Sequence, residues 1–181
     1  MKLNLANKLT ILRIFLIPVF MIFLLARIPY GVSIAALIFI IAALTDTLDG
    51  YIARKRNQIT TLGKFMDPLA DKLLVSAALI SLVQMGRLPA WVVVIIISRE
   101  FTISILRAVA AAEGVVIAAS WWGKAKTISQ IIAIIAILID NFPFRYIGIP
   151  MDQILIFVAV IFTVISGIDY LYLNKQIIMK E

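Results

Sequence analysis

The chain has 181 residues, of which 63% are hydrophobic and 15% charged, and its mean hydropathy is +1.07. Because an average soluble domain is roughly 45–50% apolar and about 25% charged, a soluble fold of this length would leave much apolar surface in water, and lipid is the expected solvent. The sequence contains no Cys and no His, which excludes a disulfide scaffold and the usual zinc, haem and His-based acid–base sites.

Six apolar stretches of about 20 residues each are predicted to be membrane-spanning helices, since such a helix crosses roughly 30 Å of hydrocarbon. In chain order they are Leu9–Ala26, Val32–Ile52, Phe65–Met85, Trp91–Ala112, Trp121–Ile139 and Ile154–Leu173. Short segments rich in Pro, Gly and Asn separate them. The sequence therefore predicts an all-α integral membrane protein that forms one domain over residues 1–181.

The distribution of Lys and Arg predicts the orientation of these helices in the membrane. Thirteen of the 17 basic residues fall on one side, and the other side holds only Arg27, Arg87 and Arg145. Positive charge marks the cytoplasmic side, so both termini are expected in the cytoplasm. The net charge of +7 is therefore expected to set the orientation of the helices in the membrane and to attract anionic lipid headgroups. No nucleic-acid partner is expected.

Four aspartates lie where the second and third spans meet. Asp46 and Asp49 end the second span, and Asp67 and Asp71 begin the third. A carboxylate inside a membrane helix costs about 2.5–3.5 kcal/mol, which makes such residues functional candidates. Spacings of three and four put each pair on one helical face, and a short loop makes the two helices antiparallel neighbours. The four carboxylates are therefore predicted to converge near the cytoplasmic surface.

Four neighbouring anions repel one another unless cations neutralise them. Two divalent cations would balance their charge, and ligands that are all oxygen favour Mg²⁺, Mn²⁺ or Ca²⁺. Two such ions held by shared carboxylates suit phosphoryl transfer. For Asp67 alone, a simpler interpretation is an N-cap ahead of Pro68 in a first helical turn.

The spacing of these residues resembles the complete signature of the CDP-alcohol phosphatidyltransferase family. The matching positions are Asp46-x-x-Asp49-Gly50-x-x-Ala53-Arg54 and, after eight residues, Gly63-x-x-x-Asp67-x-x-x-Asp71. The resemblance implies that family's fold, a homodimer, and an active site at the cytoplasmic face of the cell membrane. It also implies a cofactor of two divalent cations, Mg²⁺ or Mn²⁺.

The resemblance further implies a role for each motif residue. Asp46, Asp49, Asp67 and Asp71 would bind the metals, and Asp71 would also be the general base. The residues that would border CDP-diacylglycerol, the lipid donor, are Gly50, Ala53, Arg54 and Gly63, with Thr60 as a further contact.

The opening Asn7-x-x-Thr10-x-x-Arg13 resembles the branch of the family whose acceptor is sn-glycerol 3-phosphate and whose products are phosphatidylglycerophosphate and CMP. The aspartate motif alone leaves other acceptors open, namely inositol phosphate, serine or phosphatidylglycerol. A phosphorylated acceptor requires fixed cations, and the candidates are Arg13, Arg99, Arg107, Lys124 and Lys126.

Three of these five cations have simpler alternatives. Arg99, near the middle of the fourth span, could instead pair with the adjoining Glu100 or with an acid of another helix. Lys124 and Lys126, at the cytoplasmic start of the fifth span, could contribute only to membrane orientation.

A rival hypothesis from another class is a proton- or cation-coupled transporter that uses the aspartates as its relay. Transporters of that kind carry such acids near the midplane and are built from paired halves. Here the acids gather near one surface and no internal repeat is visible. The sequence therefore favours the enzyme.

Overall fold

The computed structural model describes residues 5–26, 28–55, 61–118 and 120–178, and in these ranges every regular element is helical. For residues 5, 6, 46–55, 61, 62, 64, 65, 177 and 178 it describes the backbone alone. The elements are α1 (Leu5–Leu25), α2 (Gly31–Lys55), α3 (Thr61–Gln84), α4 (Ala90–Ala112), α5 (Trp121–Leu138), the 3-10 helix η1 (Phe144–Ile147), α6 (Met151–Leu173) and α7 (Lys175–Ile178).

Each of the six predicted apolar stretches is a helix, which confirms the all-α prediction. The ends differ most at α1 and α3, which begin at Leu5 and Thr61 rather than at Leu9 and Phe65. Asp67 and Pro68 therefore lie inside α3, so the N-cap interpretation of Asp67 is wrong. Within the described ranges, two helices, Asn7–Leu25 and Met151–Leu173, are long and apolar enough to cross a membrane, and Gly31–Thr45 is a shorter apolar helix.

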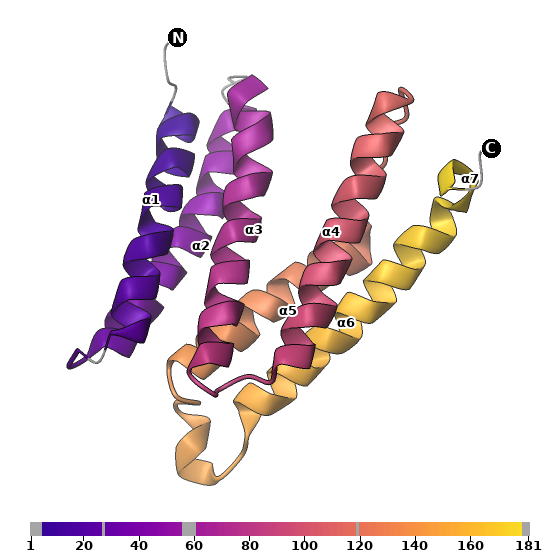
Figure 1. Cartoon of the computed structure of the whole chain (residues 1–181). Coiled ribbons are helices and arrows are strands. Elements are labelled where there is room, and N and C mark those ends of the chain that lie inside the picture. Colours follow the sequence, from indigo (N-terminus) through magenta and orange to yellow (C-terminus); the bar gives the residue numbers. More distant parts are fainter. Residues whose placement is uncertain (1–4, 27, 56–60, 119, 179–181) are drawn as a thin grey trace. The chain divides into compact units, whose positions relative to one another are not determined.

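The chain divides into two compact units. The first comprises residues 1–87 and 137–140, and in it α1 lies along both α2 and α3 (Figure 1). The rings of Phe20 on α1 and Phe39 on α2 are both fully buried, with centroids 5.8 Å apart. Buried alanines such as Ala42 and Ala78 add little bulk, which lets membrane helices approach closely.

Glycine is required at the corner between α1 and α2. A Cβ atom at Gly31 would stand 2.5 Å from the carbonyl oxygen of Phe23, closer than any side chain tolerates. The preceding Tyr30 has φ of 60°, a left-handed conformation that turns the chain back along α1. The start of α2 is thereby held against the end of α1.

One face of α1 is apolar and exposed. Leu12, Phe15, Val19 and Ile22 recur at helical spacing, and all four side chains are exposed. A large contiguous apolar face of this kind is unusual on a soluble protein. It is the face expected to contact lipid.

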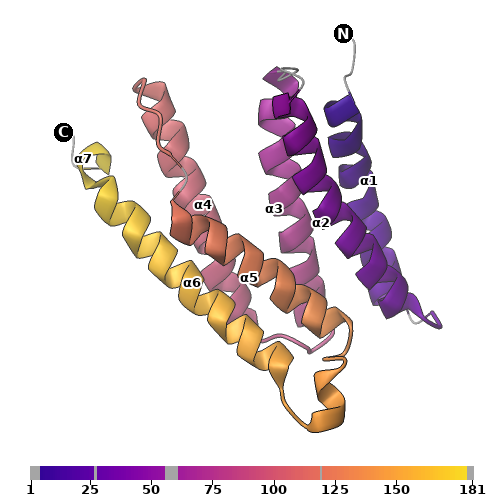
Figure 2. The same cartoon turned by 180° about the vertical axis from the view of Figure 1, so that it is seen from behind.

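The second unit comprises residues 88–136 and 141–181, and in it α4 packs beside α6 (Figure 2). Ile103 and Leu106 on α4 form a buried cluster with Tyr170 on α6. In α5, the ring of Trp122 lies with its centroid 6.1 Å from that of Phe162 on α6. Side chains from three helices therefore build this unit.

Candidate active site

The aspartate-bearing segments lie at one end of the first unit. There the beginning of α1, the end of α2 and the beginning of α3 lie together (Figure 1). Asp46 and Asp49 belong to the last turns of α2, and Asp67 and Asp71 to the first half of α3. The two helices are antiparallel neighbours, as the short loop between them predicts.

Asp67 is held by a residue of α1. The Thr10 hydroxyl, which is fully buried, donates a hydrogen bond of 2.6 Å to Oδ1 of Asp67. Asn7 and Arg13 lie three residues before and after Thr10, and both are buried, Arg13 to 1% exposure. All three polar residues of the α1 motif thus point into the unit rather than toward its surface, next to an expected metal ligand.

The remaining motif residues differ in how much of them the structure describes. Gly63 is buried in the first turn of α3, and Asp71 is partly buried one turn after Asp67. The side chains that lie outside the described part are those of Asp46, Asp49, Gly50, Ala53 and Arg54, and Thr60 lies outside it altogether. Among the described side chains no three acids come together. The side chains of Asp46 and Asp49 are not among those described, so the convergence of the four carboxylates stays a prediction.

The donor set at this end fits hard divalent cations. The four aspartates offer only oxygen, and the chain has neither His nor Cys to bind a softer metal. The Thr10 hydroxyl occupies one lone pair of Asp67 and leaves the carboxylate further acceptor positions. Such second-sphere hydrogen bonds commonly orient metal-binding carboxylates.

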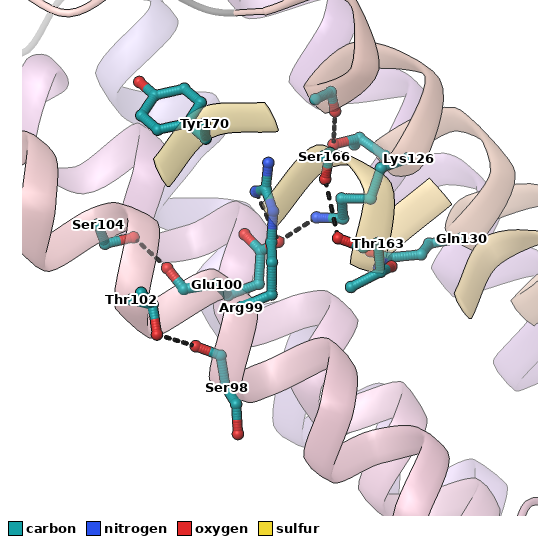
Figure 3. Close-up of polar contacts among 12 residues, drawn as sticks. Ser98, Arg99, Glu100, Thr102, Ser104, Lys126, Gln130, Thr163, Ser166 and Tyr170 are labelled. Carbon is teal, nitrogen blue, oxygen red and sulfur yellow. Dashed lines mark hydrogen bonds and ion pairs between the residues drawn. The ribbon is translucent and has the colours of Figure 1, made fainter. Parts of the chain in front are cut away.

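The second unit contains a part-buried cluster of three charges. Nη1 of Arg99 lies 3.3 Å from Oε1 of Glu100, its neighbour on α4. Nζ of Lys126 reaches from α5 to hydrogen bond the same oxygen (Figure 3). The Arg99 and Lys126 side chains are 12% and 4% exposed. Arg99 therefore does pair with Glu100, and Lys126 joins that pair instead of lying on the surface as an orientation charge.

Two glycines make room for Arg99. A Cβ atom at Gly123 on α5 would lie 3.6 Å from Nη2 of Arg99, and one at Gly167 on α6 would lie 3.4 Å from its Cγ. Larger side chains at these positions would displace the arginine. Its Nε atom is buried and has no hydrogen-bond acceptor in the described part of the chain.

The other two predicted cations of this unit are Arg107 and Lys124. Arg107 donates through Nε to the hydroxyl of Tyr170, and its Cζ lies 5.2 Å from the centre of that ring. Tyr170 in turn donates to the carbonyl of Ala118 at 3.3 Å. Lys124 is exposed at the start of α5. Of the predicted acceptor-binding cations, Arg99 and Lys126 are thus the two that contact the same carboxylate, that of Glu100.

Sequence reasoning gave Glu100 no functional role and did not connect Thr10 with Asp67. An acid next to an arginine inside an apolar span is a usable signal, because each charge is costly there unless paired. Thr10 could have been found from its place between Asn7 and Arg13 on one helical face.

Comparison with known proteins gives one consistent result. The sequence model for CDP-alcohol phosphatidyltransferases matches residues 3–165. The chain is 51% identical to the CDP-diacylglycerol–glycerol-3-phosphate 3-phosphatidyltransferase of Bacillus subtilis, over 96% of each chain. It is 43% identical to the protein of the same name from Haemophilus influenzae, over 97% of this chain and 95% of that one. A probable phosphatidylglycerophosphate synthase of Mycobacterium tuberculosis is 40% identical over 92% of this chain and 79% of its own length.

Proposed function

Because the chain belongs to the CDP-alcohol phosphatidyltransferase family, we propose that it transfers the phosphatidyl group of CDP-diacylglycerol to sn-glycerol 3-phosphate. The products are phosphatidylglycerophosphate and CMP, and the reaction is a step of phospholipid synthesis. The observation that carries this conclusion is the 51% identity, over nearly the whole of both chains, to a relative named for that reaction. The pattern Asn7-x-x-Thr10-x-x-Arg13, which resembles the branch of the family that uses sn-glycerol 3-phosphate, supports the same acceptor.

The proposal includes the placement of the chain in the membrane. All six long helices span the cytoplasmic membrane as one domain, with both termini and the aspartates on the cytoplasmic side, where most of the Lys and Arg lie. The apolar exposed face of α1 supports contact with lipid. A homodimer is the assembly that family resemblance implies.

The proposed catalytic centre lies between the ends of α2 and α3. Asp46, Asp49, Asp67 and Asp71 would hold two divalent cations, Mg²⁺ or Mn²⁺. Such ions would supply charge that neutralises the carboxylates and stabilises the attacking and leaving oxygens. The residues proposed to border the cytidine diphosphate are Gly50, Ala53, Arg54, Thr60 and Gly63.

In the reaction, the anhydride bond that joins the β-phosphorus of CDP-diacylglycerol to CMP is replaced by an ester bond to the acceptor, and the ester to diacylglycerol is kept. The acceptor hydroxyl forms a bond to that phosphorus, and the bond to the bridging oxygen breaks so that CMP leaves with the electron pair. Asp71 accepts the proton of the attacking hydroxyl. The acceptor phosphate is bound by cations drawn from Arg13, Arg99, Arg107, Lys124 and Lys126. No covalent enzyme intermediate is required, which suits a chain without His or Cys.

Acceptor identity is tested by measuring CMP release from the purified protein with CDP-diacylglycerol and Mg²⁺. Each reaction receives one acceptor: sn-glycerol 3-phosphate, inositol phosphate, serine or phosphatidylglycerol. Release with sn-glycerol 3-phosphate is expected. Release with inositol phosphate but none with glycerol phosphate would overturn the acceptor assignment and keep the reaction type.

Thr10→Val should weaken the proposed metal site, because it removes the hydroxyl that orients Asp67 and keeps the side chain's shape. We expect CMP release to fall roughly 10-fold and the Mg²⁺ concentration for half-maximal rate to rise several-fold. Thr10→Ser, which keeps the hydroxyl, should restore most of both values.

Thr102→Val is the matched control for this substitution. Thr102 is exposed, and its hydroxyl donates to the Ser98 carbonyl of its own helix. It should behave as the unsubstituted protein does. An unchanged rate and Mg²⁺ response in Thr10→Val would show that the hydrogen bond to Asp67 has no part in the activity.

A further inference from the structure

We propose that Glu100 is a positioning residue, which holds Arg99 and Lys126 together as a preformed site for the phosphate of the acceptor. The inference rests on the proposed function, which places these two cations at the acceptor. The acceptor-binding residues predicted from the sequence are all Arg or Lys, and the proposal adds an acidic residue to them. The carboxylate acts through its two partners and does not touch the substrate itself.

A single carboxylate oxygen joins cations from two helices. Oε1 of Glu100 lies 3.3 Å from Nη1 of Arg99 on α4, and it also accepts a hydrogen bond from Nζ of Lys126 on α5. Figure 3 shows the Lys126 side chain extended toward this carboxylate. Long basic side chains lose considerable rotamer entropy when they are fixed. Because Glu100 fixes both before the acceptor arrives, less of that entropy is lost on binding.

Arg99 keeps a donor that an anion could use. Without Glu100, the part-buried Arg99 and the buried Lys126 would lose the carboxylate that both of them contact and would bear more of their desolvation cost. Nε of Arg99 is buried without an acceptor among the described residues, which leaves a donor that the three-charge cluster does not use. A phosphate dianion would supply acceptor oxygens for it.

Glycines of two neighbouring helices lie against the Arg99 side chain. The Cβ sites of Gly123 and Gly167 lie 3.6 Å and 3.4 Å from atoms of Arg99, so the arginine lies over glycines of both α5 and α6. A methyl group would just touch it, and a larger side chain would displace it. Small residues at these places and the carboxylate of Glu100 therefore fix the same guanidinium by independent means.

A different role for Glu100 predicts the opposite effect of its removal. If the carboxylate only balanced charge and competed with the phosphate, its neutralisation would strengthen acceptor binding. If it positions the two cations, neutralisation lets them separate and weakens acceptor binding. The sign of the change in acceptor KM therefore separates the two roles.

Glu100→Gln in the purified full-length protein tests the proposal. We expect the KM for sn-glycerol 3-phosphate to rise about tenfold and the KM for CDP-diacylglycerol to change less than about twofold. Thermal stabilisation of the protein by added sn-glycerol 3-phosphate should weaken in parallel. The matched control is Glu113→Gln, the same change at an exposed residue just after α4, which should alter neither KM. An acceptor KM that is unchanged or lower in Glu100→Gln would overturn the proposal.

Gly167→Leu keeps the proposal testable if Glu100→Gln does not fold. The leucine should displace Arg99 and raise the acceptor KM, and Gly167→Ala should raise it less. An unchanged acceptor KM in Gly167→Leu would contradict the positioning of Arg99. If the unsubstituted protein releases no CMP with sn-glycerol 3-phosphate, the proposed function itself fails. An active protein whose variants keep its acceptor KM overturns only the role of Glu100.

Discussion

The Asp71→Asn variant is expected to stay folded and to release CMP about 10³-fold more slowly than the unsubstituted protein. Asn matches Asp in shape but carries no charge, so it neither accepts the proton of the attacking hydroxyl nor holds a cation as a carboxylate does. Loss of a general base alone lowers rates by roughly 10²–10⁴-fold. The measurement is the initial rate of CMP release at saturating CDP-diacylglycerol and sn-glycerol 3-phosphate.

A matched substitution separates this effect from general damage. Asp152→Asn makes the same chemical change in the first turn of α6, and its rate should stay near that of the unsubstituted protein. Size-exclusion profiles and thermal unfolding should be alike for the two variants. Turnover by Asp71→Asn within a fewfold of the starting protein would exclude Asp71 as base and as essential ligand.

Removal of divalent cations should abolish activity, which is the second large effect. In the proposed site the four aspartates would repel one another without cations, and the leaving CMP would lack a group to stabilise its charge. Excess chelator is expected to lower CMP release by more than about 10³-fold, and Mg²⁺ or Mn²⁺ added in excess should restore it. Ca²⁺ should restore less, because its longer and more flexible coordination holds the reacting oxygens less well.

The control for chelation is the same concentration of chelator saturated beforehand with Mg²⁺. It should leave the rate unchanged, which separates metal removal from other effects of the chelator on the protein or its lipid. Activity that survives metal-free conditions would require the aspartates to be neutralised by basic side chains. The two-cation site would then be wrong.

The helices could be predicted from the sequence because length and apolarity are local properties. Each apolar stretch of about 20 residues became one helix, and the aspartates fell at the ends of α2 and α3 as expected. Their spacing, which needs no tertiary information, was enough to suggest the family. The start of α3 was misplaced because the polar residues that precede Phe65 continue the helix beyond its apolar part.

The contacts of the second unit could not be predicted in the same way. A helix in lipid is apolar on both its protein-facing and its lipid-facing sides, so hydrophobic periodicity does not fix its rotation. That rotation decides whether Lys126 meets Glu100 or turns outward. It also decides whether Arg107 meets Tyr170. The two glycines that make room for Arg99 come from other helices and give no local signal of this packing.

The proposed mechanism requires that aspartates from two consecutive helices share a pair of hard cations. A crystal structure of the protein with Mn²⁺, measured at a wavelength where manganese scatters anomalously, tests this claim directly. It should show two anomalous peaks between α2 and α3, with Asp46, Asp49, Asp67 and Asp71 as their ligands. Manganese bound elsewhere, or these four side chains pointing apart with basic residues between them, would contradict it.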